Sequence, residues 1–228
     1  MPGPYFTQRT FAFLRDLGQN NDRAWFADNK DRYERDVREP ALAFIVDFAP
    51  RLKKISPHFR ADPRKAGGSL FRIHRDTRFA KDKSPYKTNT GIQFRHEAGK
   101  DAHAPGFYLH IEPGAAFMAL GAWHPDSATL RAIRDAIVEN PRAWAAATER
   151  GSFPEVFTLA GDSLVRGPRG YDPEHPRIED LKRKDFVGVT ELTKKRLTAP
   201  DFLDDFEGLC RSGAPLVRWL CRATGHPF

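Results

Sequence analysis

Positively charged side chains are concentrated in one short segment of this chain, residues 64–87. The segment holds eight Lys or Arg residues and two Asp residues, a net charge of +6, whereas all 228 residues together carry +7. Like charges packed this densely repel one another unless internal carboxylates or an external anion neutralise them, and two carboxylates cannot neutralise eight cations. The segment therefore predicts a binding site for an anion.

Arginine and lysine in this number favour phosphate as the anion. The planar guanidinium group of arginine offers two parallel, charge-assisted hydrogen bonds, and lysine adds a mobile point charge. Tyr86 follows the rigid Pro85 and could stack on a base or donate its hydroxyl to a phosphate oxygen. We expect the anion to be bound by Arg72, Arg75, Arg78, Lys81, Lys83, Tyr86 and Lys87, supported by His74, Asp76, Asp82 and Arg169.

The favoured function is recognition of phosphate, carried either by a nucleotide-like ligand or by nucleic acid. Basic residues are not spread along a long face of the chain, which favours a compact pocket over a surface that follows a duplex. The expected partner is therefore a phosphate-bearing small molecule or a nucleic acid.

Two alternatives stay open. In the first, the chain is an enzyme that acts on a phosphorylated or carboxylated metabolite, with or without a metal ion, and His110 or a His, Asp or Tyr of the segment carries the proton. In the second, the segment is structural and binds no ligand. Its two Asp residues then pair with its arginines, and Phe79 and Tyr86 anchor it to the core.

Motifs for metals, cofactors and nucleophilic catalysis are missing from the sequence. There is no HExxH or CxxC pair, no GxSxG elbow and no dinucleotide fingerprint, and residues 66–69 lack the GK[ST] ending of a phosphate-binding loop. His110 and Glu112 share one face of an expected strand, but two ligands do not complete a site. The other candidate metal ligands are scattered: His74, Asp76, His96, His103, His124 and His175. We expect neither a metal ion nor a cofactor.

The elements that must position these residues follow from the spacing of apolar side chains. Three- and four-residue spacing predicts helices at 10–17, 22–37, 42–56, 127–138, from Pro141 onwards, and at 200–221. Pro40 is expected to break or kink the second run, and the last helix is expected to break near 213–215. Alternation predicts strands at 69–75, 90–96, 106–112, 115–122, 163–166 and 186–190.

Strands that follow one another through short turns pair antiparallel, as in the hairpin expected around Pro113-Gly114. We therefore expect an α+β fold with a mainly antiparallel sheet flanked by N-terminal and C-terminal helices. A single domain, 1–228, would contain an N-terminal helical part at 1–57, a sheet-containing core at 64–190 and a C-terminal helix at 199–224.

Three features indicate a cytoplasmic protein that does not span a membrane. No apolar run approaches the ~20 residues of a membrane helix, and the N-terminus does not resemble a signal peptide. Cys210 and Cys221 lie about three turns, ~16 Å, apart on one helix, which is too far for a disulfide. We expect them to be thiols in the core.

A second basic and turn-rich stretch lies at 167–176. With Arg166, Arg169 and the three basic residues at 182–184, it could form a second wall of the same anion site. The same Gly and Pro residues equally suit a loop that crosses the surface.

The basic segment also resembles the signature of a known family. Residues 72–87 match RxxRDxRFxxDKxPYK at every specified position. This is the defining motif of a mainly bacterial family, the domain of unknown function 2461. Three further stretches resemble the corresponding stretches of that family's members: residues 20–26, 105–110 and 167–176. The resemblance covers nearly the whole chain, and it implies a shared fold without naming a mechanism.

Overall fold

The computed structural model of this chain describes residues 3–99 and 105–228. The helices are α1 (Gln8–Gln19), α2 (Arg23–Asp28), α3 (Lys30–Tyr33), α4 (Glu39–Ile55), α5 (Ser127–Glu139), α6 (Pro141–Thr148), α7 (Phe153–Val156), α8 (Ile178–Leu181), α9 (Lys194–Leu197) and α10 (Phe202–Ala223), with a π-helix, η1 (Glu34–Arg38), before α4. The strands are β1 (Phe59–Arg60), β2 (Thr90–His96), β3 (Gly106–Ile111), β4 (Phe117–Ala122), β5 (Thr158–Ala160) and β6 (Phe186–Glu191).

The six strands of the described residues form one sheet, in the order β1-β2-β3-β4-β6-β5. Each strand runs antiparallel to its neighbours. β3 and β4 form the predicted hairpin, and Gly114 turns it with a φ of +86°. The α+β class, the antiparallel sheet and the flanking terminal helices are thus confirmed.

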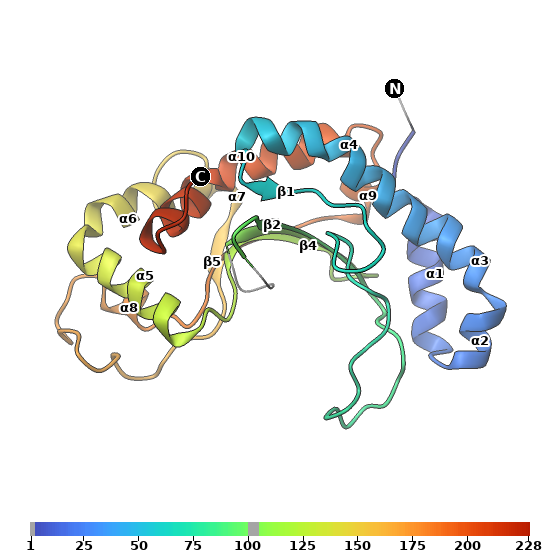
Figure 1. Cartoon of the computed structure of the whole chain (residues 1–228), viewed down its shortest axis with the longest axis horizontal. Coiled ribbons are helices and arrows are strands. Elements are labelled where there is room, and N and C mark those ends of the chain that lie inside the picture. The colour runs from blue at the N-terminus through green and yellow to red at the C-terminus, as the bar shows by residue number, and fades with distance from the viewer. Residues whose placement is uncertain (1–2, 100–104) are drawn as a thin grey trace.

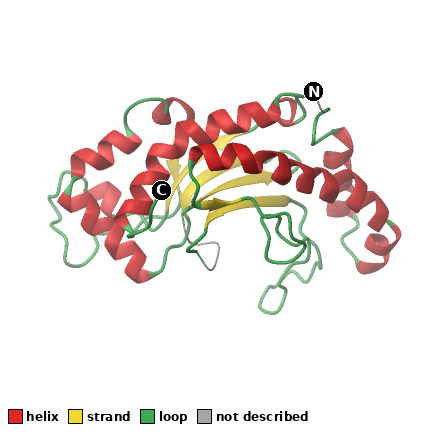
Figure 2. Ribbon diagram, turned by 45° about the horizontal axis from the view of Figure 1, so that its top comes forward, coloured by secondary structure: helices red, strands yellow, loops and turns green. Residues whose placement is uncertain are grey.

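Helices α4 and α10 lie across one face of the sheet (Figures 1 and 2). Their phenylalanines build the core beneath them. The rings of Phe44 and Phe48 from α4 and Phe206 from α10 pack on one another and on Phe94 of β2, with centroids 4.8–6.5 Å apart. All four side chains are fully buried, so this face of the sheet is closed.

The opposite face of the sheet is concave, and a flank descends on each side of it (Figure 1). One flank consists of α5, α8 and the loop at 161–177. The other is the basic segment at 72–87, called the arm from here on, which hangs free of the sheet as a long loop. The chain therefore has the shape of an arch, and the arm forms one of its legs.

The strand predicted at 69–75 is wrong. This stretch makes two isolated bridges, Leu70 with Ile92 and His74 with Tyr86. Within the arm, Arg75 donates its backbone N–H to the carbonyl of Pro85, but a proline has no N–H to donate in return. The two sides of the arm therefore meet at the His74–Tyr86 bridge without continuing as a ladder of paired strands.

The strand predicted at 163–166 is also wrong, because β5 forms earlier, at Thr158–Ala160, and pairs with β6. Ser163 makes only an isolated bridge to Arg183. Val165, the residue that suggested burial, is 95% exposed. Apolar side chains alone do not make a strand where no partner edge is within reach.

The break predicted near 213–215 is wrong as well, since α10 runs without interruption through Gly213 and Pro215. One face of α10 is buried along its whole length. That burial outweighs the hydrogen bond that a proline removes from a helix interior.

The N-terminal helices follow the predictions with shifted ends. Thr7, rather than Thr10, caps α1, and Asp22 caps α2 through the backbone N–H of Trp25 at 2.9 Å. The helix predicted at 22–37 is divided into α2, α3 and η1. Pro40 does perturb the helix there, because the wider π turn lies directly before it, in η1.

Both cysteines are buried, free thiols, as predicted. Burial raises the pKa of the Cys221 thiol to about 12. Among the described residues, no helix combines the length and the hydropathy needed to cross a bilayer.

Candidate functional site

The root of the arm is fastened to the N-terminal helices by Tyr86. Its ring is buried and stacks on Phe26 of α2, with centroids 4.1 Å apart and planes inclined by 21°. Asn21 clasps the backbone of Tyr86 from both sides: its amide group donates to the carbonyl at 2.9 Å and accepts from the N–H at 3.1 Å. Because its ring is already stacked on Phe26, Tyr86 serves to position the arm. Phe79, the other aromatic residue of the arm, is 95% exposed.

Two ion pairs hold the tip of the arm together. Arg75 pairs with Asp82, and Arg78 pairs with Asp76 at 2.7 Å. The Arg78 guanidinium lowers the pKa of Asp76 to about 2. Both pairs are largely exposed, so their contribution to folding stability is small. Their main effect is to neutralise the charge of two of the predicted anion ligands, Arg75 and Arg78.

Four of the predicted cations form no ion pair with a carboxylate among the described residues: Arg72, Lys81, Lys83 and Lys87. Lys83 donates instead to the carbonyl of Thr77 at 2.9 Å, and the charge of Arg72 helps to lower the pKa of Asp76. Lys87 is half-buried, with its ammonium nitrogen 5.4 Å from the centroid of the Phe71 ring. Burial and, secondarily, the charge of Arg72 lower the pKa of Lys87. Arg72 and Lys87 are therefore close enough to repel each other at the root of the arm.

The remaining predicted residues lie apart from this pair. His74 is exposed on the arm, with its ring 5.2 Å from that of Tyr86. Arg169 is exposed on the loop at 161–177, which belongs to the other flank of the arch (Figure 1). Tyr171 fastens that loop to α5 through a 2.7 Å hydrogen bond to Asp135. The two basic stretches thus face each other across the concave sheet and do not meet in one pocket.

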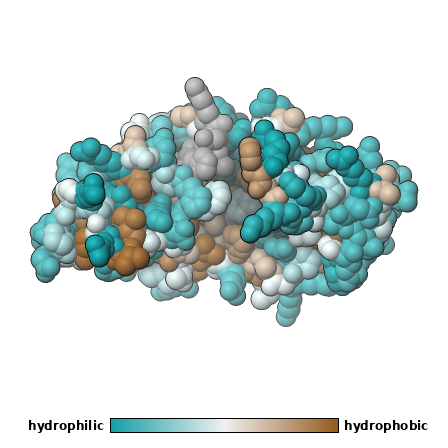
Figure 3. Space-filling model, turned by 90° about the horizontal axis from the view of Figure 1, so that it is seen from below, coloured by the Kyte–Doolittle hydropathy of each residue, from teal (hydrophilic) through white to brown (hydrophobic). Residues whose placement is uncertain are grey.

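The concave face is lined by every second residue of the strands. The register places three rows of side chains across it: Arg95, Gly106, Gly121, Val187 and Ala160; then Gln93, Tyr108, Ala119, Val189 and Thr158; then Gly91, His110, Phe117 and Glu191. Small and apolar residues dominate the middle. Figure 3, which looks onto this face, shows apolar side chains near its middle, around a hollow.

The hollow is a cavity of about 490 Å³. Its floor is formed by the small residues of the sheet, and aromatic rings border it: Phe71, Tyr108, Phe117 and Trp123. Small-molecule sites in proteins occupy roughly 300–1,000 Å³ and are mostly apolar with a few polar groups. Phe71 is the residue that joins the cavity to Lys87 and hence to the root of the arm.

A chain of hydrogen bonds runs along β3 beside the cavity. The ring of His110 lies 3.0 Å from the Tyr108 hydroxyl on one side and 3.0 Å from a carboxylate oxygen of Glu112 on the other. The strand prediction that put His110 and Glu112 on one face is confirmed. Burial, with Glu112 nearby, raises the pKa of Tyr108 to about 12, so this hydroxyl is a hydrogen-bond donor at neutral pH.

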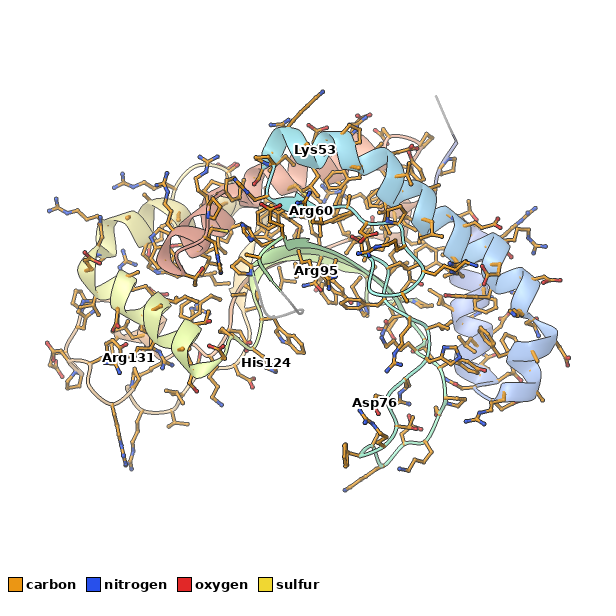
Figure 4. All side chains as sticks on the ribbon, in the orientation of Figure 1. Lys53, Arg60, Asp76, Arg95, His124 and Arg131 are labelled. Atoms are coloured by element: carbon orange, nitrogen blue, oxygen red, sulfur yellow. The ribbon has the colours of Figure 1, made fainter. Side chains whose placement is uncertain are left out.

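A second His–carboxylate pair lies on the other side of the cavity, where Figure 4 labels His124. The Nδ1 atom of His124 is 2.8 Å from an oxygen of Asp185, which also accepts the His124 backbone N–H at 2.7 Å. The other oxygen accepts the backbone N–H of Asp162 at 2.9 Å. Burial alone would raise the pKa of Asp185, but these hydrogen bonds outweigh it and hold that pKa below its usual range.

The described residues contain no group of three or more His, Cys, Asp or Glu side chains that could hold a metal ion. His103, one of the scattered candidate ligands, lies outside the described residues.

Sequence reasoning found the arm but missed the cavity and Asp185. Alternation did place His110 with Glu112 on one strand face, yet it does not reveal which face of a sheet stays open. Asp185 is a single acid ahead of a strand and carries no local signal.

Comparison with known proteins returned a family match. A family described as "Conserved hypothetical protein (DUF2461)" matches residues 9–219. No curated protein matches the chain.

Proposed function

We propose that this chain, which belongs to the DUF2461 family, binds a phosphate-bearing ligand of nucleotide type. The phosphate lies against Arg72 and Lys87 at the root of the arm, and the ring system occupies the cavity on the concave face of the sheet. One observation carries this proposal: the Lys87 ammonium lies 5.4 Å from the ring of Phe71, one of the aromatic rings that border the cavity, and Arg72 follows Phe71 in the chain.

A bound anion would relieve the repulsion between Arg72 and Lys87. At the tip of the arm, Asp76 and Asp82 each form an ion pair with an arginine, whereas Arg72 and Lys87 at the root form none among the described residues. An anion between the two root cations would stabilise the charged form of Lys87, which burial disfavours. Phosphate fits this position because the guanidinium group can bind it through two hydrogen bonds while the ammonium adds charge.

The cavity would hold the part of the ligand that is not phosphate. A phosphate alone would not use an apolar hollow of about 490 Å³. A base or another flat ring would gain by stacking on Phe71 or on the half-exposed Trp123. The cavity therefore favours a nucleotide-like ligand over inorganic phosphate.

Calorimetric titration with thymidine 5′-monophosphate, thymidine and inorganic phosphate tests the proposal. The nucleotide should bind more tightly than either part. Arg72→Gln and Lys87→Gln should each weaken nucleotide binding about 10-fold, the value of one charge-assisted contact of about 1.5 kcal/mol. Arg131→Gln, which removes an exposed cation from α5 on the opposite flank, is the matched control. Equal affinity of all three variants and the parent would refute the proposal.

A second candidate function, binding of nucleic acid along the arm, is favoured by one observation. Phe79 is 95% exposed at the tip, and the Arg78 guanidinium carbon lies 5.9 Å from the centroid of its ring. An exposed ring among cations is suited to stacking on an unpaired base. Phe79→Ala should then weaken binding of a short oligothymidylate but leave binding of the mononucleotide unchanged.

Salt separates the two candidates further. A partner that contacts many phosphates loses affinity steeply as salt rises, because each contact releases counterions. A ligand held by Arg72 and Lys87 should show a shallow dependence, with a slope of about 2 or less. A steep slope with oligonucleotide and no binding of the mononucleotide would favour the second candidate.

A further inference from the structure

We propose that His124 is a general base that activates water for hydrolysis of a phosphodiester held in the cavity, with Asp185 as its positioning residue. The inference rests on the proposed function, because it takes the same nucleotide-like ligand as the substrate. It adds a reaction that ligand binding alone does not require.

The hydrogen bonds of Asp185 fix the protonation of the imidazole ring. One carboxylate oxygen lies within 2.8 Å of both the backbone nitrogen and Nδ1 of His124. A carboxylate only accepts hydrogen bonds, so Nδ1 carries a proton, and in the neutral imidazole Nε2 then has the free lone pair. This is the tautomer in which a histidine accepts a proton from water.

The carboxylate itself is held rigidly behind the wall of the cavity. Asp185 is 1% exposed and also accepts the backbone N–H of Asp162. Gly161, which lines the cavity, has a φ of +103°, and a Cβ atom there would lie 2.4 Å from the Cβ of Asp185. The wall can thus be thin at this point only because residue 161 has no side chain.

The position of His124 is the second observation. Its side chain is half exposed, and its ring stacks on Trp123, which lines the cavity, with centroids 4.2 Å apart. Its backbone has a φ of +46°, the only positive φ of a non-glycine residue in the described part of the chain. Histidine is one of the non-glycine residues that adopt this conformation more often than most. The conformation lets the backbone N–H and the ring of His124 contact the same carboxylate oxygen of Asp185.

The reaction balances without a further reactant. As the oxygen of water bonds to phosphorus, its proton passes to Nε2 of His124, and the bond from phosphorus to the leaving oxygen breaks. The leaving group departs with the electron pair of that bond, and the imidazolium later returns its proton to the leaving group or to solvent.

Thymidine 5′-(4-nitrophenyl phosphate) is a suitable probe, since it carries a nucleoside and releases coloured 4-nitrophenolate. His124→Asn keeps a donor for Asp185 and tolerates the positive φ, but it cannot accept the proton. It should lower kcat about 100-fold or more, in the usual range for general-base catalysis, with KM unchanged. Asp185→Asn should also lower kcat more than it changes KM. His58→Asn, a histidine beside β1 that is paired with Glu97, is the control.

Chemical rescue separates catalysis from a structural role. His124→Gly suits the backbone and leaves a gap where the ring was, so added imidazole should restore turnover to this variant and not to His124→Asn. If the probe binds through Arg72 and Lys87 but the parent and His124→Asn turn it over at the same rate, the inference is overturned and the proposed function stands. If the probe does not bind at all, both fall.

Discussion

At the scale of single residues, the clasp between Asn21 and Tyr86 explains why the arm has a fixed root. The two residues are 65 positions apart, and each belongs to a stretch that resembles the family signature. Asn21 contacts only the backbone carbonyl and N–H of Tyr86, which every residue except proline carries. A substitution of Tyr86 therefore leaves these two hydrogen bonds in place, whereas a substitution of Asn21 removes them.

Asn21→Ala should lower the free energy of unfolding by about 1–3 kcal/mol, because it leaves two half-buried backbone groups of Tyr86 without partners. Urea denaturation followed by circular dichroism measures the change. Asn20→Ala is the control, since its amide bonds only to the carbonyl of Asp16 in its own helix. Equal effects of both substitutions would show that the clasp contributes nothing specific.

Asp185 makes stability depend on pH. Its pKa in the folded chain lies below the ordinary value, so its contribution is complete above the unfolded-state pKa of about 4 and is lost as the pH falls below it. Asp185→Asn should melt at a lower temperature than the parent at neutral pH. The gap should narrow as the pH falls below about 4, the unfolded-state pKa. A gap of constant size across this range would show that ionisation of Asp185 does not stabilise the fold.

The limits of sequence reasoning are also clearest at this scale. It identified the arginines and lysines of the arm, because local charge density is written in the sequence. It could not tell that Asp82 and Asp76 form their ion pairs with Arg75 and Arg78, whereas Arg72 forms none within 3–99 and 105–228. Pairing depends on how the two legs of the arm cross, and that is a property of the fold.

At the scale of elements, the best-predicted segments are those with a simple period and a partner close in the chain. β2 has the predicted bounds, and the hairpin of β3 and β4 closes at the predicted turn. The failures at 163–166 and within α10 have a common cause. In both, long-range packing decided whether an element forms, and local propensity did not.

Two glycines of α10 test that explanation. A Cβ atom at Gly213 would lie 1.8 Å from a methyl carbon of the buried Leu120, so Gly213→Ala should destabilise the fold by about 1–3 kcal/mol. A Cβ atom at Gly208 would meet nothing within 4 Å, so Gly208→Ala should stabilise it by about 0.5–1 kcal/mol. Denaturant titration of both variants measures the difference. A gain in stability at Gly213 would mean that α10 does not press on β4.

At the scale of the whole molecule, the two faces of the sheet differ in what lies on them. Helices α4 and α10 close one face of the sheet, and the large buried phenylalanines lie there. The other face is left to the cavity, the arm and the His124–Asp185 pair. Substitutions on the closed face should therefore act on stability, whereas the proposed binding and turnover should depend on the concave face, where Asp185 contributes to stability as well.

The thiols report on the closed face. Cys210 and Cys221 are fully buried, and burial raises the pKa of both, so neither thiolate forms at neutral pH in the folded chain. Neither should react with a disulfide reagent such as Ellman's until denaturant unfolds the protein. Both should then react together, in the same transition that circular dichroism records. Reaction in the native state would indicate that α10 opens locally.

The two outermost strands of the sheet, β1 and β5, have two and three residues. A long outer strand offers a row of unused backbone donors and acceptors to any extended chain that meets it, and this is how folded β-proteins begin to assemble into insoluble fibres. Strands this short offer only a few such groups before the backbone turns away. The sheet can therefore leave one face without covering helices and still offer no long edge on which a second sheet could form.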